Sequence, residues 1–148
     1  MNIIEKVKQL LSEYPQIKNF SNGIEIDYTS NKPDNFGLYS VGDTLVNEDV
    51  EGNQDRKHSF VLNATHQSMN NFERLANSTF LLELGYWLEK IKDIPVTVLI
   101  GEDKKNAIIT SLSSANAMAY SVPTGKLEDG ITYQLQIYAD YSVESEEF

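Results

Sequence analysis

The side chains best suited to chemistry are few: two histidines, and no cysteine, in a chain of 148 residues. His58 and His66 fall in a stretch that alternates apolar and polar residues, which predicts a β-strand. Eight residues apart on a strand they share a face but are separated by roughly 26 Å, and on a helix by about 12 Å. One zinc ion cannot bind both. We therefore predict no histidine metal site and interpret each histidine as a polar residue at a strand end.

Neighbouring carboxylates could perform acid–base catalysis, and they occur at Glu48-Asp49, Glu102-Asp103 and Glu128-Asp129. Adjacent side chains point in different directions on regular structure. Such catalysis also needs one carboxyl buried beside apolar groups, whereas these pairs lie in polar stretches. The spacings of a calcium loop, a phosphate-binding glycine loop and a serine nucleophile elbow are all missing from the sequence. We therefore predict that the protein is not an enzyme and uses no cofactor or metal.

The net charge of −10 is unevenly distributed. Residues 43–55 carry five acids and no base, and residues 127–148 carry six acids and no base. The rest of the chain holds eleven acids and twelve bases, a net charge of +1. Sequence-independent binding of nucleic acid needs clustered Lys and Arg, so we expect none. We also expect no membrane span, because no long apolar run is present, and the lack of cysteine suits assembly in a reducing cytoplasm.

Two helices are predicted from apolar residues that recur every 3.6 positions, over residues 2–14 and 70–92. Pro15 should end the first. In the second, we expect Trp87 to be buried in the core, facing the sheet with Phe80, Leu84 and Ile91. Weak helix formers at Asn77-Ser78-Thr79 leave open a break that would divide this helix in two.

Strands are predicted where apolar and polar residues alternate, most clearly over Ile131–Tyr141. One hairpin is expected to run out over 44–47, turn at 51–54 and return over 56–65. A second is expected around Ser113-Ser114-Ala115-Asn116, with strands at 106–112 and 117–122. Shorter strands are expected at 24–28 and 36–41.

Together these elements predict a single α+β domain over residues 1–141, followed by an acidic tail, 142–148, that we expect to fray. The sheet should be mixed or antiparallel, with the two main helices packed on one face and one β-hairpin protruding. An isolated hairpin is marginal in water, so we expect the protruding one to be held by a partner. Tyr138 lies on the polar face of the last strand, where an exposed aromatic residue favours a protein contact. The predicted contact residues are Val46, Glu48, Asp49, Val50, Glu51, Asp55, Arg56 and Tyr138.

The order of the segments resembles a family of bacteriophage proteins known as minor capsid, tail-terminator or tail-completion proteins. The resemblance rests on a leading amphipathic helix, a hairpin that returns through Arg56–Leu62, a helix carrying Gly85–Glu89 with its Trp-Leu-Glu segment, and the terminal strand Tyr133–Tyr138. It spans residues 2–141. The present chain differs from the family in its more acidic hairpin and tail.

The resemblance implies a virion protein at the head-proximal end of the tail, assembled in the host cytoplasm. It would form a ring, commonly a hexamer, that caps the tail tube, ends tube growth and forms the tail side of the head–tail joint. Its partners would be further copies of itself, the tail tube protein and the head connector protein, with DNA passing through the ring. A headless tail-like particle would use a similar protein. The alternative that the composition leaves open is an acidic inhibitor or immunity-type protein that binds a basic protein partner.

Overall fold

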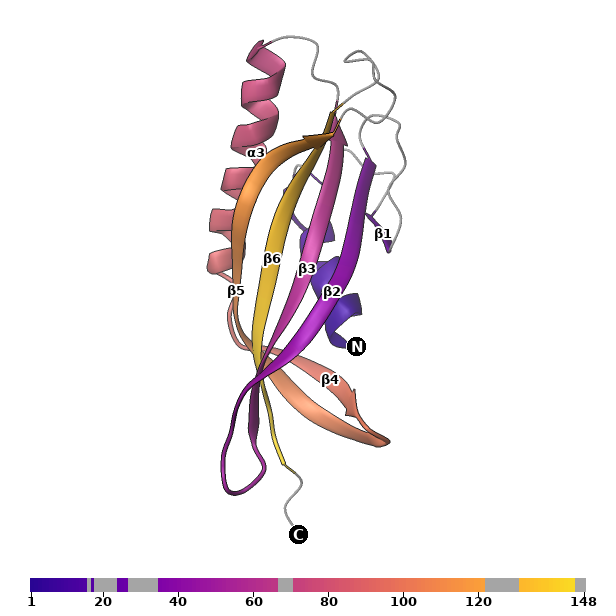
Figure 1. Ribbon diagram of the computed structural model, residues 1–148, viewed down its shortest axis with the longest axis vertical. Helices are drawn as coiled ribbons and strands as arrows, with labels where there is room; N and C mark the ends of the chain where they lie inside the picture. The colour runs from indigo at the N-terminus through magenta and orange to yellow at the C-terminus, as the bar shows by residue number, and fades with distance from the viewer. Residues whose placement is uncertain (16, 18–23, 27–34, 67–70, 122–130, 146–148) are drawn as a thin grey trace.

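The computed structural model describes residues 1–15, 17, 24–26, 35–66, 71–121 and 131–145. Within these ranges the chain forms two helices and a six-stranded sheet (Figure 1). In chain order the elements are α1 (Ile3–Ser12), β1 (Ile24–Ile26), β2 (Asn35–Glu48), β3 (Gln54–His66), α3 (Asn71–Glu89), β4 (Ile94–Ile100), β5 (Asp103–Ser121) and β6 (Ile131–Val143).

The strands lie in the order β1-β2-β3-β6-β5-β4. Five of them form an antiparallel series from β2 to β4, and the short β1 pairs with β2 in parallel over residues 36–38 only. Both helices lie behind the sheet in the view of Figure 1. The predicted α+β class, with helices on one face of the sheet and a protruding hairpin, is confirmed.

The core lies between the helices and one face of the sheet. On β6 the alternate residues from Ile131 to Val143 are buried, as the strict alternation of the sequence predicts. On the helices the most deeply buried side chains include Val7, Leu11 and Leu84. The opposite face of β6 is half-buried from Gln134 to Ser142.

The two helices meet through aromatic side chains. The ring of Tyr14, just after α1, lies 5.8 Å from that of Phe80 and 5.1 Å from that of Trp87, centroid to centroid. Trp87 was expected within the core; instead it is half-buried and packs against it, while the next residue, Leu88, is fully buried. The apolar stripe of α3 is therefore turned slightly from the predicted phase.

Both helices begin one residue later than predicted and also end earlier, α1 at Ser12 and α3 at Glu89. α1 starts with a capping box in which Glu5 N–H donates to Asn2 Oδ1 (2.8 Å) and Asn2 N–H donates to Glu5 Oε1 (3.3 Å). α3 is continuous through Asn77, so the alternative of a break there is wrong. Asn70, where the second helix was predicted to begin, lies outside the described residues.

The second predicted hairpin does not exist, because residues 103–121 form one strand, β5. The small residues at 113–116 do not turn the chain; Ser114 instead faces α3, where a Cβ atom added to Gly85 would overlap its hydroxyl. Asn116 has a positive φ of 56°, within a register irregularity between Ala115 and Met118. The small side chains thus serve close packing and a β-bulge.

β4 was not predicted, and it forms the hairpin with β5 that turns at Gly101, where φ is 65°. β4 is an edge strand. Its Pro95 has no N–H, and the N–H of Thr97 donates to the Met1 carbonyl oxygen (2.9 Å). Proline is tolerated on an edge strand where its missing donor points away from the sheet, which explains how Pro95 fits within a strand.

β6 extends two residues beyond its predicted end, to Val143, which is buried. Beyond the end of β6, Ser145 N–H donates to Asn53 Oδ1 (2.9 Å). Within β6, Ser142 Oγ donates to Asp55 Oδ1 (2.7 Å). The start of the acidic segment is thus bound to the β2–β3 hairpin; residues 146–148 lie outside the described part.

Candidate functional site

The β2–β3 hairpin reaches beyond the body of the sheet, at the end of the molecule where the β4–β5 hairpin also projects (Figure 1). Its tip is closed by Asp49, whose carboxylate accepts hydrogen bonds from Glu51 N–H (2.9 Å), Asn53 N–H (2.9 Å) and the Asn53 side-chain amide (3.0 Å). Hydrogen bonds from the Asn53 side chain and from backbone amides lower the pKa of the Asp49 carboxyl. Gly52 adopts a φ of 88°, which the turn requires. The tip is therefore a defined turn.

Aliphatic side chains are exposed along this hairpin although it is otherwise polar. Val41, Leu45 and Val46 are each about half exposed or more, and Val50 at the tip is fully exposed. Beyond Leu38, β2 has no strand on its outer side within the described residues, because β1 pairs only with residues 36–38. An exposed edge with aliphatic side chains is a surface that a protein partner can cover.

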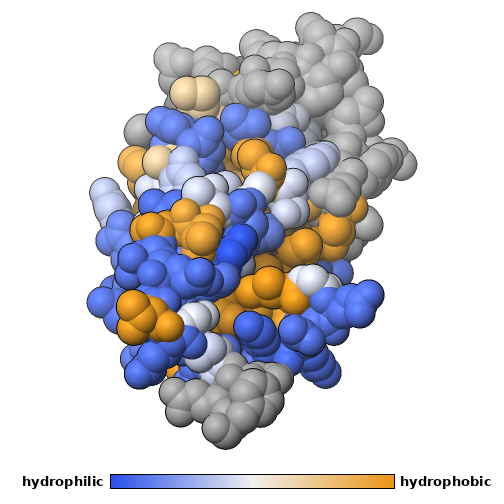
Figure 2. Space-filling model, turned by 60° about the horizontal axis from the view of Figure 1, so that its bottom comes forward, coloured by the Kyte–Doolittle hydropathy of each residue, from blue (hydrophilic) through white to orange (hydrophobic). Residues whose placement is uncertain are grey.

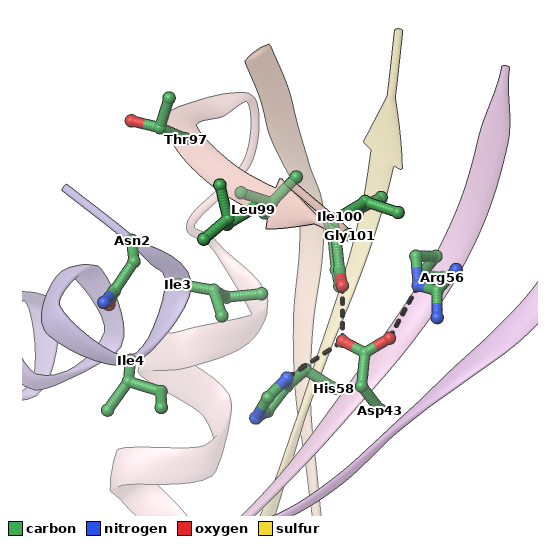
Figure 3. Close-up of a pocket in the computed structure, with 12 residues that line it drawn as sticks. Asn2, Ile3, Ile4, Asp43, Arg56, His58, Thr97, Leu99, Ile100 and Gly101 are labelled. Atoms are coloured by element: carbon green, nitrogen blue, oxygen red, sulfur yellow. Dashed lines mark hydrogen bonds and ion pairs between the residues drawn. The ribbon is translucent and has the colours of Figure 1, made fainter. Parts of the chain in front are cut away.

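At the base of the hairpin, three strands are joined through the carboxylate of Asp43 on β2. It accepts hydrogen bonds from Arg56 Nε (2.7 Å) and His58 Nδ1 (2.9 Å) on β3, and from the Tyr141 hydroxyl on β6. Figure 3 shows the carboxylate between Arg56 and His58. We call these four residues the Asp43 network. It fixes the direction in which the hairpin leaves the sheet.

The charges of the network stabilise one another. Burial would raise the pKa of the Asp43 carboxyl, but the hydrogen bonds from Tyr141, Arg56 and His58 outweigh it, so the pKa is lowered. Burial and the bond to Asp43 raise the pKa of the Tyr141 hydroxyl, and the bond to Asp43 raises that of Arg56. Asp43 and Arg56 are thus charged at neutral pH, and Tyr141 is neutral.

Ser40 extends the network into the connectivity of a serine hydrolase triad. Its Oγ lies 2.7 Å from His58 Nε2, while His58 Nδ1 faces Asp43. A nucleophile must also face the space that holds its substrate. A surface hollow beside Asp43 could hold a substrate, but Ser40 does not line it. The Asp43 carboxylate also accepts hydrogen bonds from Arg56 and Tyr141. The arrangement is better explained as a structural link between β2 and β3.

Beside the Asp43 network is a hollow of about 430 Å³. Its other walls are mostly aliphatic and come from the start of α1, with Ile3 and Ile4, and from the end of β4, with Leu99 and Ile100; Asn2 and Thr97 add polar groups. In Figure 3 these side chains stand around the space beside Asp43. Figure 2 brings this end of the molecule forward and shows apolar surface between hydrophilic areas. We call this space the basal hollow.

The predicted contact residues do not form one site. Val46, Glu48, Asp49, Val50, Glu51 and Asp55 gather at or near the hairpin tip, as expected from their order. Arg56 instead belongs to the Asp43 network. Tyr138 lies higher on β6, paired with Ser59, and is half-buried; its hydroxyl donates to Gln136 Oε1 (2.8 Å), and Lys57 Nζ lies 5.5 Å from its ring centroid. The structure separates Tyr138 from the tip.

Two members of the network were not expected there. His58, interpreted from the sequence as a residue at a strand end, is buried in the middle of β3. Tyr141 was predicted only as the last residue of the final strand. A signal was present for Asp43: it is a carboxylate that faces basic residues across a predicted hairpin. The side chain of His66 lies outside the described part.

Within the described ranges, no group of three or more His, Asp and Glu side chains could hold a metal ion, and no helix is long and apolar enough to span a membrane. No family model matches the chain, and no curated protein is significantly similar to it. One similar solved structure aligns with 97% of this chain and 95% of its own, with 10% identity and a TM-score of 0.42. That similarity is too low to indicate a shared function.

Proposed function

We propose that this protein is a structural subunit of a phage, or of a phage-tail-like particle, that assembles into a ring at the head-proximal end of the tail tube. The ring ends tube growth and forms the tail side of the head–tail joint. Its partners are its own copies, the tail tube protein and the head connector protein. The family resemblance of the sequence motivates this proposal, and the geometry of the hairpin supports it.

The observation that carries the proposal is a fixed hairpin with uncovered aliphatic side chains. The Asp43 network holds the base of the hairpin, and hydrogen bonds to Asp49 close its tip. Yet Val46 and Val50 face solvent. Fully burying one such side chain contributes roughly 1.5–3 kcal/mol. A partner that covered the hairpin would gain this free energy with little loss of conformational entropy, because the backbone is already ordered.

The acids of the tip fit the same role. Glu48 and Asp49 repel DNA phosphate, so a hairpin with these acids at the border of the ring's channel would keep a passing genome from binding. The absence of bases between residues 43 and 55 agrees with this position. No catalysis is required of such a protein, and we propose none.

The experiment is to replace residues 46–54 with a short glycine-containing turn. We expect a variant that still melts cooperatively, because the Asp43 network and the core are kept, but that no longer forms rings by electron microscopy or native mass spectrometry and no longer caps tail tubes. Glu89→Gln, which removes one exposed negative charge on α3 and leaves the hairpin intact, is the control and should still assemble. A shortened variant that terminates tubes normally would contradict the proposal. A parent protein that stays monomeric at every concentration and binds a basic protein would favour an acidic inhibitor instead.

A further inference from the structure

The fully exposed Val50 and the basal hollow are complementary features of the same molecule. Val50 is an aliphatic side chain on a projecting turn, and the hollow is lined by aliphatic side chains that include the exposed Leu99. Val50 is on the turn of the β2–β3 hairpin, and the hollow is bordered by the end of β4. The β2–β3 and β4–β5 hairpins project from the same end of the molecule (Figure 1). Val50 does not enter the hollow of its own chain, because it is fully exposed.

Charge is complementary as well. Glu51 follows Val50 directly, and Lys104 lies beside Leu99 as its partner across the β4–β5 ladder. Neither side chain makes an ion pair or hydrogen bond within the described part of the protein. The tip therefore presents an aliphatic side chain, Val50, next to an unpaired acid. The hollow presents an aliphatic side chain, Leu99, next to an unpaired base.

We propose that the basal hollow of one copy receives the hairpin tip of a second copy, with Val50 against Leu99 and Ile100 and with Glu51 beside Lys104. This inference rests on the proposed function, because it names the contact that would build the ring. Tip and hollow are different surfaces, so the contact is heterologous: each copy gives its tip to one neighbour and its hollow to the other. Contacts of this kind close into rings when the rotation between copies permits.

The size of the surfaces explains why a closed assembly is needed. A hairpin tip in a hollow buries less than the roughly 800 Å² per partner of a standard stable interface. A single contact is therefore weak. In a closed ring each copy is held by two contacts, and breaking one does not release it.

The absence of cysteine allows a direct test by disulfide cross-linking under mild oxidation. Val50→Cys and Leu99→Cys are both exposed positions, so neither variant should disturb the fold. We expect a mixture of the two single variants to give covalent dimers, and the double variant to give a series of larger multimers. Leu82→Cys on α3, also exposed but outside the hollow, is the matched control for Leu99→Cys and should give no dimer with Val50→Cys.

The charge contact gives a second readout. Lys104→Glu should reduce the cross-linking of Val50→Cys with Leu99→Cys, and adding Glu51→Lys on the partner should restore it. Val50→Cys alone cross-linking as well as the mixture would show a tip-to-tip contact and overturn the proposal. So would equal cross-linking to Leu82→Cys, or no cross-linking at all.

The failure of this inference can be distinguished from that of the proposed function. Rings that form and cap tubes without the Val50–Leu99 cross-link would overturn the inference and leave the function standing. Cross-linked multimers that do not cap tail tubes would support the contact and contradict the function.

Discussion

Gly85 of α3 packs directly against Ser114 of β5, and a Cβ atom at Gly85 fits only if the Ser114 hydroxyl moves. A Cβ atom at Gly85 would overlap the Ser114 hydroxyl, while the Ser114 Cβ would be 3.5 Å away, at ordinary contact distance. Glycine in a helix interior costs roughly 0.8–1.0 kcal/mol relative to alanine. The close approach of helix and strand is therefore maintained against helix propensity.

Gly85→Ala should lower the free energy of unfolding by about 1 kcal/mol, because overpacking costs roughly 1–3 kcal/mol and exceeds the gain in propensity. In a Ser114→Ala background the same change should instead stabilise the protein by about 1 kcal/mol, since the hydroxyl is gone. Urea unfolding of the parent, both single variants and the double variant measures this coupling. Additive effects of the two changes would contradict the close packing.

The Asp43 network should make stability depend on pH. The folded-state pKa of Asp43 lies below its unfolded value, so its contribution is fully present at neutral pH and is lost as pH falls through the folded-state pKa. Asp43→Asn should therefore be less stable than the parent at pH 7. The difference should shrink below about pH 4, where the unfolded carboxyl takes up its proton. Glu51→Gln controls for the loss of one exposed negative charge. A difference between Asp43→Asn and the parent that is the same at pH 7 and pH 2.5 would refute the linkage.

Ser40 should be an ordinary serine despite its bond to His58. We expect no labelling by a fluorophosphonate probe and no hydrolysis of an activated ester by the purified protein, because Ser40 does not line the basal hollow. His58→Gln should lower the melting temperature, since it breaks the link from Ser40 to Asp43. Labelling of Ser40 that disappears in His58→Gln would establish a nucleophile and overturn this interpretation.

The sequence predicted elements well where one physical rule acts alone. β6 alternates strictly because one of its faces is buried along its whole length, and its burial follows the predicted pattern. The hairpin predicted within β5 was wrong because residues 113–116 are small for another reason. They allow Gly85 of α3 to approach the strand, and a local sequence pattern cannot reveal such a tertiary contact. β4 was missed because Pro95 ordinarily ends an element, and only its place at the sheet edge makes it acceptable.

The site was predicted in part for similar reasons. The hairpin and its exposed tip follow from local sequence. The Asp43 network depends on register, and β2 is irregular between Ser40 and Gly42 and again between Leu45 and Asn47. The irregularity between Leu45 and Asn47 lies between the turn and Asp43 and shifts the pairing by one residue, so counting back from the turn would place Asp43 opposite Ser59 instead of His58. The contact with Tyr141 joins residues 98 positions apart, which no local pattern encodes.

The edge at β4 has a consequence for how the sheet can grow. Pro95 offers no donor there and Thr97 has already used its own, so a foreign strand cannot form a continuous ladder along β4. Within the described residues, β2 has no strand and no proline along its outer side from Ser40 to Glu48. Within the described residues the sheet therefore has one open side: two copies that met through β2 would each cover the exposed edge of the other, and a ladder built in this way would end at two copies.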